Sequence, residues 1–161
     1  MIYNPGTLRV LAAVIVLIIV DGSCPNYWTA YGSSCYVLIK NPSTWAGADD
    51  ICKDFDAFLV EVDTKDENEF LKSFLKNKSL TVKAVWLGGN DLLSEDHWMW
   101  VHSKEPVTFT AWGPSQPDNA ANEENCLELY IENSYKWNDN SCSVRQYFIC
   151  EQPEPSDVII G

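Results

Sequence analysis

Side chains that carry oxygen gather in two short segments near the C-terminal end of the sequence. The first segment contains Gln116, Asp118 and Glu124, and the second is Asn138-Asp139. Together they offer three carboxylates and two amide carbonyls. Hard oxygen donors of this kind are the ligands that Ca²⁺ prefers in proteins. The five side chains therefore predict a calcium site.

The first segment lies in a long stretch with little hydrophobic periodicity, residues 107–125. Within a compact domain, a long irregular segment is usually either functional or disordered. Because this one carries three of the five candidate ligands, we expect it to be a binding loop.

The rest of the chain predicts the elements that position this loop. After a turn at 41–43, apolar residues from Trp45 to Phe55 recur at helical spacing. A second helix begins at Thr64, with Glu67 in the position of a capping box. Short apolar segments predict strands at 35–39, 58–60, 82–89, 98–101, 126–131, 135–137 and 146–151. Helices first and strands afterwards are typical of an α+β fold.

The first 22 residues resemble a signal peptide. Arg9 precedes an apolar run over 10–20, and Gly22 follows it. The alternative is a membrane anchor, but spanning a bilayer needs about 20 apolar residues. We therefore expect residues 1–22 to be cleaved and the protein to be secreted. The expected domain covers 23–151, and a polar segment, 152–161, forms a flexible tail.

Six cysteines in a secreted chain predict three disulfides, which could pair in 15 ways. A structural zinc site is the weaker alternative, because the sequence has no CxxC pair.

The charge balance excludes several partners. There are 23 acidic and 11 basic residues, for a net charge of −12. Such a chain repels nucleic acid and anionic membranes, and no second apolar run is present to insert into a bilayer.

An enzyme is also disfavoured, since GxSxG, HExxH and phosphate-binding glycine loops are absent. Adjacent acids such as Glu123-Glu124 do not supply the set separation that glycoside hydrolysis requires.

Three motifs resemble one known family. Gln116-Pro117-Asp118, Trp137-Asn138-Asp139 and the core segment Trp86-Leu87-Gly88-Gly89 are similar to those of C-type (calcium-dependent) lectin domains. The resemblance implies two helices, two small antiparallel sheets, a long binding loop and a cis bond at Pro117. It also implies one disulfide pairing: Cys24–Cys35, Cys52–Cys150 and Cys126–Cys142.

The resemblance assigns all five oxygen donors, Gln116, Asp118, Glu124, Asn138 and Asp139, to both Ca²⁺ and the sugar. A Gln-Pro-Asp triplet is associated in the family with galactose and N-acetylgalactosamine. One departure is that Asn119-Ala120-Ala121 follows the triplet, where galactose binders usually carry an aromatic residue. An auxiliary calcium would take Asp91, Glu95, Asn119, Glu124 and Asn125.

The family also suggests recognition of microbial or cell-surface glycans in innate immunity. Single sugar sites bind weakly, so avidity would require several sites, for example in a homo-oligomer. The alternative is a lectin-like domain that binds a protein or a mineral surface. Asn77-Lys78-Ser79 is an N-glycosylation sequon, whose alternative is an unmodified surface asparagine.

Overall fold

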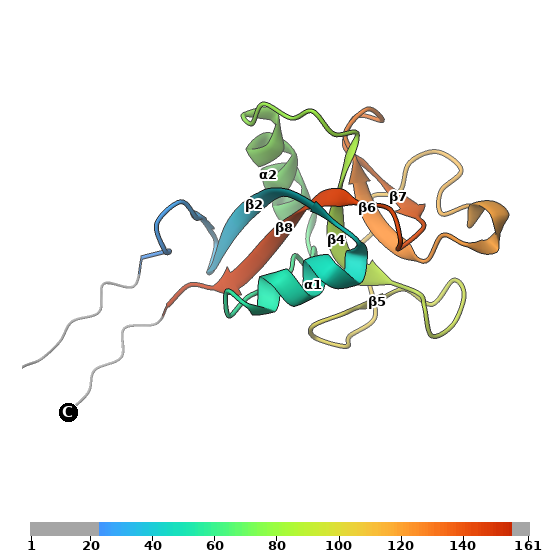
Figure 1. Cartoon of the computed structure of the whole chain (residues 1–161), viewed down its shortest axis with the longest axis horizontal. Coiled ribbons are helices and arrows are strands. Elements are labelled where there is room, and N and C mark those ends of the chain that lie inside the picture. The colour runs from blue at the N-terminus through green and yellow to red at the C-terminus, as the bar shows by residue number, and fades with distance from the viewer. Residues whose placement is uncertain (1–22, 156–161) are drawn as a thin grey trace, which may run out of the picture.

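A computed structural model describes residues 23–155 of the chain (Figure 1). The expected signal peptide, 1–22, lies outside the described residues. The helices are α1 (Trp45–Lys53), α2 (Lys65–Lys76) and a short 3-10 helix, η1 (Ala120–Asn122). The strands are β1 (Thr29–Tyr31), β2 (Ser34–Ser43), β3 (Phe58–Leu59), β4 (Ala84–Asn90), β5 (Met99–Trp100), β6 (Cys126–Tyr130), β7 (Lys136–Asn140) and β8 (Gln146–Pro153).

The strands form one mixed sheet rather than the two separate antiparallel sheets that we expected. Its order is β1-β2-β8-β4-β6-β7, with β3 added beside β8 and β5 beside β4. Antiparallel pairing holds on both sides, but β4 and β8 pair in parallel through Val85–Tyr147 and Trp86–Phe148. That central pair joins the two expected sheets. The α+β class and the two helices are confirmed, and α1 and α2 lie on opposite sides of β2 and β8 (Figure 1).

Both helices begin at threonine caps. The Thr44 hydroxyl accepts from the Gly47 N–H, and the Thr64 hydroxyl accepts from the Glu67 N–H. In a capping box, the Glu67 carboxylate would accept from the N–H of the N-cap residue, Thr64. Here it accepts instead from the N–H of the preceding residue, Asp63, at 3.1 Å. The expected turn at 41–43 instead lies within β2. Helix α1 ends at Lys53, so Phe55 lies outside it and is 49% exposed.

The predicted disulfide pairing is confirmed. Cys24–Cys35 closes the N-terminal hairpin, Cys52–Cys150 joins α1 to β8, and Cys126–Cys142 joins β6 to the segment after β7. Covalent closure of long loops stabilises the fold mainly by restricting the unfolded chain. Here it also holds the strand that carries Asn138-Asp139 beside β6.

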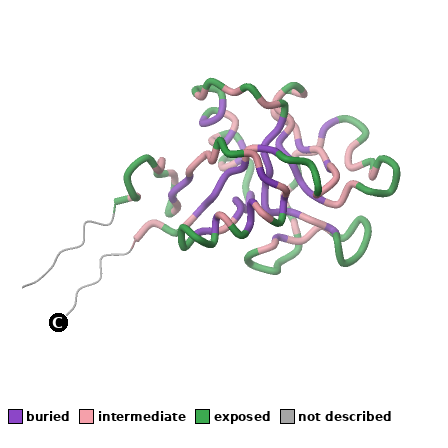
Figure 2. Tube along the Cα trace, in the orientation of Figure 1, coloured by how far each residue is buried: buried purple, intermediate pink, exposed green. Residues whose placement is uncertain are grey.

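Four buried tryptophans form much of the core, and each indole N–H has a partner. Trp45 donates to the Leu87 carbonyl and Trp86 to that of Ser43, while the other two donate to side chains, Trp100 to Asp63 and Trp137 to Asn68. Buried residues lie mainly along the central strands, and exposed residues lie mainly in the loops (Figure 2). Trp137 is fully buried beneath the binding loop, so it is a core residue rather than a sugar-stacking surface.

Strand β8 extends past the expected domain boundary at 151. Residues 152 and 153 belong to β8, and the Glu154 N–H donates to the Ser33 carbonyl at 2.8 Å. Pairing with β2 therefore holds the chain beyond the expected boundary at 151.

A buried carboxylate on β8 gives the fold a pH dependence. Glu151 is 7% exposed, and the Tyr36 hydroxyl donates both to it and to Glu67. Burial, followed by the nearby charges of Glu67 and Glu61, raises the pKa of Glu151 to about 7. The folded chain therefore binds this proton more tightly than the unfolded chain. The resulting stabilisation is present below about pH 4.5 and is lost as pH rises through 7.

Replacing Glu151 with glutamine should remove this dependence, because an amide side chain cannot ionise. The wild type should lose stability between pH 5 and pH 8, whereas Glu151→Gln should not lose this contribution. The free energy of unfolding of the variant minus that of the wild type should therefore increase over this range, by about 3 kcal/mol at most. Urea denaturation at both pH values measures it. Glu69→Gln, on the exposed side of α2, is the matched control. A difference between Glu151→Gln and wild type that is equal at both pH values would contradict the assignment.

Candidate functional site

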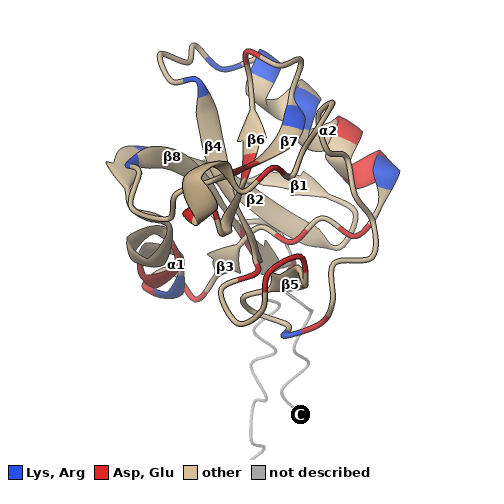
Figure 3. Cartoon of the chain, turned by 90° about the vertical axis from the view of Figure 1, so that its right-hand side faces the viewer, with Lys and Arg blue, Asp and Glu red and all other residues tan. Residues whose placement is uncertain are grey.

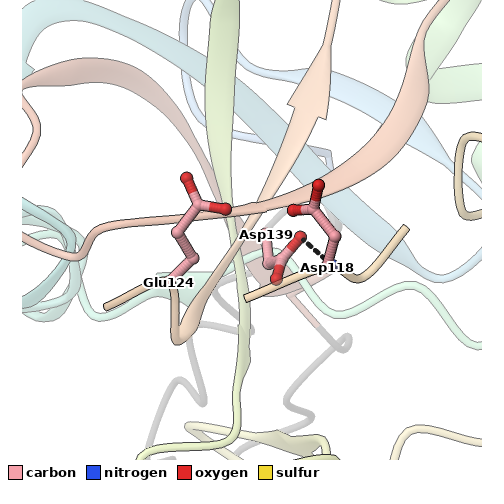
Figure 4. Close-up of side chains that lie close together, drawn as sticks. All are labelled: Asp118, Glu124 and Asp139. Carbon is pink, nitrogen blue, oxygen red and sulfur yellow. Dashed lines mark hydrogen bonds between the residues drawn. The ribbon is translucent and has the colours of Figure 1, made fainter. Parts of the chain in front are cut away.

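Three carboxylates converge between the long loop and β7. Asp118 and Glu124 come from the loop and Asp139 from β7, and their ligand oxygens lie within 4.8 Å of one another (Figure 4). In the part of the chain that the structure describes, this is the only such group of three or more. The structure thus brings together the three carboxylates among the five predicted oxygen donors, from both segments of the sequence.

Asp139 is the residue that holds the loop in place. It is fully buried, and one of its oxygens accepts from the N–H of Asp118 at 3.1 Å (Figure 4). The other accepts from the N–H of Asn119 at 2.7 Å. Glu124 closes the other side, where its Oε2 accepts from the Ala120 N–H and its own N–H donates to Asn119 Oδ1, both at 3.1 Å. The carboxylates therefore organise the backbone around them.

The two amide residues differ in their surroundings. The bond before Pro117 is cis, as predicted, and Gln116 Oε1 is buried without a hydrogen-bond partner among residues 23–155. Asn138 instead donates from Nδ2 to Glu128 Oε1 at 3.0 Å and to the Asp139 carbonyl. Both hydrogens of Asn138 are thus engaged, so donating to a sugar, as expected from the sequence, would require exchanging one contact.

The electrostatics of the cluster suit a cation. Within residues 23–155, none of the three carboxylates forms an ion pair with a lysine or arginine. Three lysines lie along α2, and the other basic residues are scattered over the rest of the chain in view (Figure 3). Burial, followed by the charges of Asp139 and Asp118, raises the pKa of Glu124. Carboxylates that repel one another and have no basic partner among the described residues fit a divalent ion that takes oxygen ligands.

The expected auxiliary site is only partly assembled. The Asp91 N–H donates to the Asn125 carbonyl at 3.2 Å, and its Oδ2 accepts from the Asp96 N–H at 3.0 Å. Its Oδ1 is buried and has no partner among the described residues. Burial, and then the charges of Glu95 and Asp139, raises the pKa of Asp91. Glu95 is exposed and does not join a second group of three carboxylates in the described part of the chain.

One residue near the site was missed in the sequence. Glu128 is 2% exposed in β6 and accepts hydrogen bonds from the amides of Asn138, Asn140 and Gln146. Burial raises its pKa, against the lowering effect of these three donors. The signal was present in the sequence, because an acid between Leu127 and Leu129 in a buried strand requires partners.

The glycosylation sequon is accessible. Asn77 is exposed and lies at the C-terminal cap of α2. This placement leaves its side chain open to modification.

The fold and the site together define a class of protein, and comparisons with known proteins agree. A family model described as "Lectin C-type domain" matches residues 41–152. Echinoidin of Heliocidaris crassispina is 32% identical over 145 residues, which cover 82% of this chain and 98% of echinoidin. This chain therefore belongs to the C-type lectin domain family.

Two further similarities come from a lectin and a solved structure. The galactose-specific lectin nattectin of Thalassophryne nattereri is 29% identical, with 80% of this chain and 79% of nattectin covered. The structure of human lithostathine aligns with a TM-score of 0.75 at 30% identity, over 81% of this chain and 99% of lithostathine. Domains of this family typically bind calcium and are generally not enzymes. Over residues 23–155, neither helix is long and apolar enough to span a membrane.

Loosening the anchor at Asp139 should free the loop. In calcium-free buffer, we expect Asp139→Asn to speed amide hydrogen exchange at 118 or 119, or at both, by at least about tenfold, because an amide NH2 group replaces one of the two oxygens that accept from these N–H groups. Exchange measured by NMR or mass spectrometry tests this. Asp118→Asn removes a carboxylate but leaves the anchor, so exchange at these positions should stay within about twofold of wild type. Equal exchange in both variants would contradict the anchoring role.

Proposed function

We propose that this protein is a calcium-dependent carbohydrate-binding protein, with its sugar site at the converging carboxylates. The observation that carries the proposal is the convergence of the carboxylates of Asp118, Glu124 and Asp139. Gln116, two residues before Asp118, adds an oxygen that is buried and has no hydrogen-bond partner among residues 23–155. Membership of the C-type lectin family supports it. Gln116, Asp118, Glu124, Asn138 and Asp139 would hold Ca²⁺.

A bound calcium ion supplies positive charge and open coordination positions that two vicinal sugar hydroxyls can fill. The residues around it supply directed hydrogen bonds. Asp118 and Glu124 accept from hydroxyls, whereas the Gln116 amide donates. The Asn138 amide group already donates to Glu128. We therefore assign the side-chain oxygen of Asn138 to the ion. Its amide group would donate to the sugar only if it gave up the bond to Glu128.

The order of amide and carboxylate sets the preferred sugar. With glutamine at 116 and aspartate at 118, donor and acceptor lie on opposite sides of the ion, which favours terminal galactose or N-acetylgalactosamine. The name of nattectin, a galactose-specific lectin, supports this choice. Ala120 offers no aromatic face for the sugar, so we expect a single-site Kd in the millimolar range, which corresponds to a binding free energy of about −4 kcal/mol.

The biological setting that we propose is extracellular. Signal-peptide cleavage after 22 would release a secreted chain, and glycans on microbial or host cell surfaces would be its partners. Several millimolar sites must bind together to give useful avidity, so we propose a homo-oligomer. We also propose that Asn77 carries an N-glycan. Binding of a protein or mineral surface through the same acidic face is the alternative that the experiment below separates.

Reversing the triplet tests the mechanism. Wild-type protein should be retained on a galactose matrix in CaCl₂ and eluted by chelator or free galactose, but not by NaCl alone. Gln116→Glu combined with Asp118→Asn should keep calcium affinity and change the galactose-to-mannose affinity ratio by about tenfold toward mannose. An unchanged sugar ranking would overturn the donor-order mechanism. Calcium binding without retention on any sugar matrix would favour the protein or mineral alternative.

The number of calcium ions is a second proposal, which rests on Asp91. Its buried unpartnered oxygen and the adjacent Asn125 fit an auxiliary ion shared with Glu124, Glu95 and Asn119. We expect about two ions per wild-type chain and about one for Asp91→Asn by calorimetry. Asp96→Asn is the matched control, because Asp96 contacts Asp91 only through its backbone N–H. Equal stoichiometry in the wild type and Asp91→Asn would contradict the second site.

A further inference from the structure

A polar pocket opens beside the candidate ion site, on the opposite face of β7. Residues alternate along a strand, so Asp139 points toward the loop while Asn138 and Asn140 point the other way. The pocket has a volume of about 450 Å³, and Asn138 is one of its walls. Asn138 joins the two regions, because its Nδ2 donates both to Glu128 and to the backbone carbonyl of Asp139 in the proposed ion site.

The floor of this pocket is fixed by the buried carboxylate of Glu128. It faces Asn138 across the β6–β7 pair and accepts from Nδ2 of Asn138 at 3.0 Å and of Asn140 at 2.9 Å, and also from Gln146. The Oδ1 of Asn140 in turn accepts from the Ser141 N–H at 2.8 Å. These bonds hold the amides in one orientation, which gives a preorganised polar surface of the kind that binds hydroxyl-rich ligands.

The rim supplies a donor and an apolar ring. Arg145 is exposed, and one guanidinium nitrogen donates to the Pro42 carbonyl at 2.6 Å. That contact steadies the side chain and uses only part of its five-donor capacity. Tyr130 is half-buried on the same face as Glu128, where its ring can pack against the C–H groups of a sugar.

The site on the loop side lacks what this pocket supplies. Asn119-Ala120-Ala121 beside the carboxylates provides no aromatic ring and no cation. Arg145, Tyr130 and the amides around Glu128 lie on the pocket side of the shared residue Asn138. A glycan whose terminal residue binds the ion can therefore gain contacts by extending into the pocket.

We propose that this pocket is a subsite for the second residue of an oligosaccharide, hydrogen-bonded by Arg145 and packed against Tyr130. The proposal rests on the proposed function, since the first residue must bind at the calcium site. The ligand class is a neutral glycan of at least two pyranose residues that ends in galactose.

The full chain in CaCl₂ should bind one galactose-terminated disaccharide about tenfold more tightly than methyl β-galactoside, through one added hydrogen bond to a charged group. Calorimetry would compare the monosaccharide with lactose, N-acetyllactosamine, melibiose and galactosyl-α1,3-galactose. Arg145→Ala should remove most of this gain and leave the monosaccharide Kd unchanged. Lys65→Ala, which makes the same charge change on exposed α2, should keep the gain. In NMR spectra, the tighter disaccharide should shift the amides of Tyr130, Asn140 and Arg145, whereas methyl β-galactoside should not.

Each outcome decides between the two proposals. Calcium-dependent binding of methyl β-galactoside with no gain for any disaccharide would overturn the subsite and leave the proposed function standing. A gain that survives Arg145→Ala, without shifts at Tyr130 and Asn140, would also overturn it. Absence of calcium-dependent binding for every sugar would overturn both.

Discussion

The pair of hydrogen bonds from the loop backbone to Asp139 is the constraint on which the site depends. A fully buried carboxylate needs partners, and here the N–H groups of Asp118 and Asn119 supply them. These bonds fold the long loop back onto β7. As a consequence, Asp118 and Glu124 come close to Asp139 although they belong to a different segment of the chain. Loop order, the proposed ion site and the proposed sugar preference are therefore linked through one residue.

Strand β7 serves two surfaces because its side chains alternate. Trp137 and Asp139 face the core and the loop, while Asn138 and Asn140 face Glu128 on β6. The Cys126–Cys142 disulfide ties the ends of this hairpin together. A charge buried in β6 thus orders the amides on one face, while a charge buried in β7 orders the loop on the other. This arrangement explains how two polar regions can lie against a core dominated by tryptophan.

The errors made from sequence have physical causes. Phe55 fits the helical period, but α1 ends at Lys53, so the ring is left half exposed. The Asn41-Pro42-Ser43 segment has the composition of a turn, yet pairing of Ser43 with Gln146 keeps it in β2. The two expected sheets are one sheet, because the parallel pairing of β4 with β8 joins segments that are far apart in sequence. In the last two cases a tertiary contact outweighed a local preference, whereas α1 ends in a local turn, in which the N–H groups of Phe55 and Ala57 donate to the Cys52 carbonyl.

The sequence by itself determined the types of residue and their approximate elements: the α+β class, two capped helices, the long loop and five oxygen donors of the kind that calcium takes. Those features are local, since they depend on composition, spacing and hydrophobic period. The tertiary structure alone decided which donors meet, that Gln116 Oε1 and Asp91 Oδ1 are left without partners among the described residues, and that Glu128 orders three amides. Hydrogen-bond partners are chosen only when distant strands pair. The local sequence could indicate that Glu128 needs partners, but not which amides supply them.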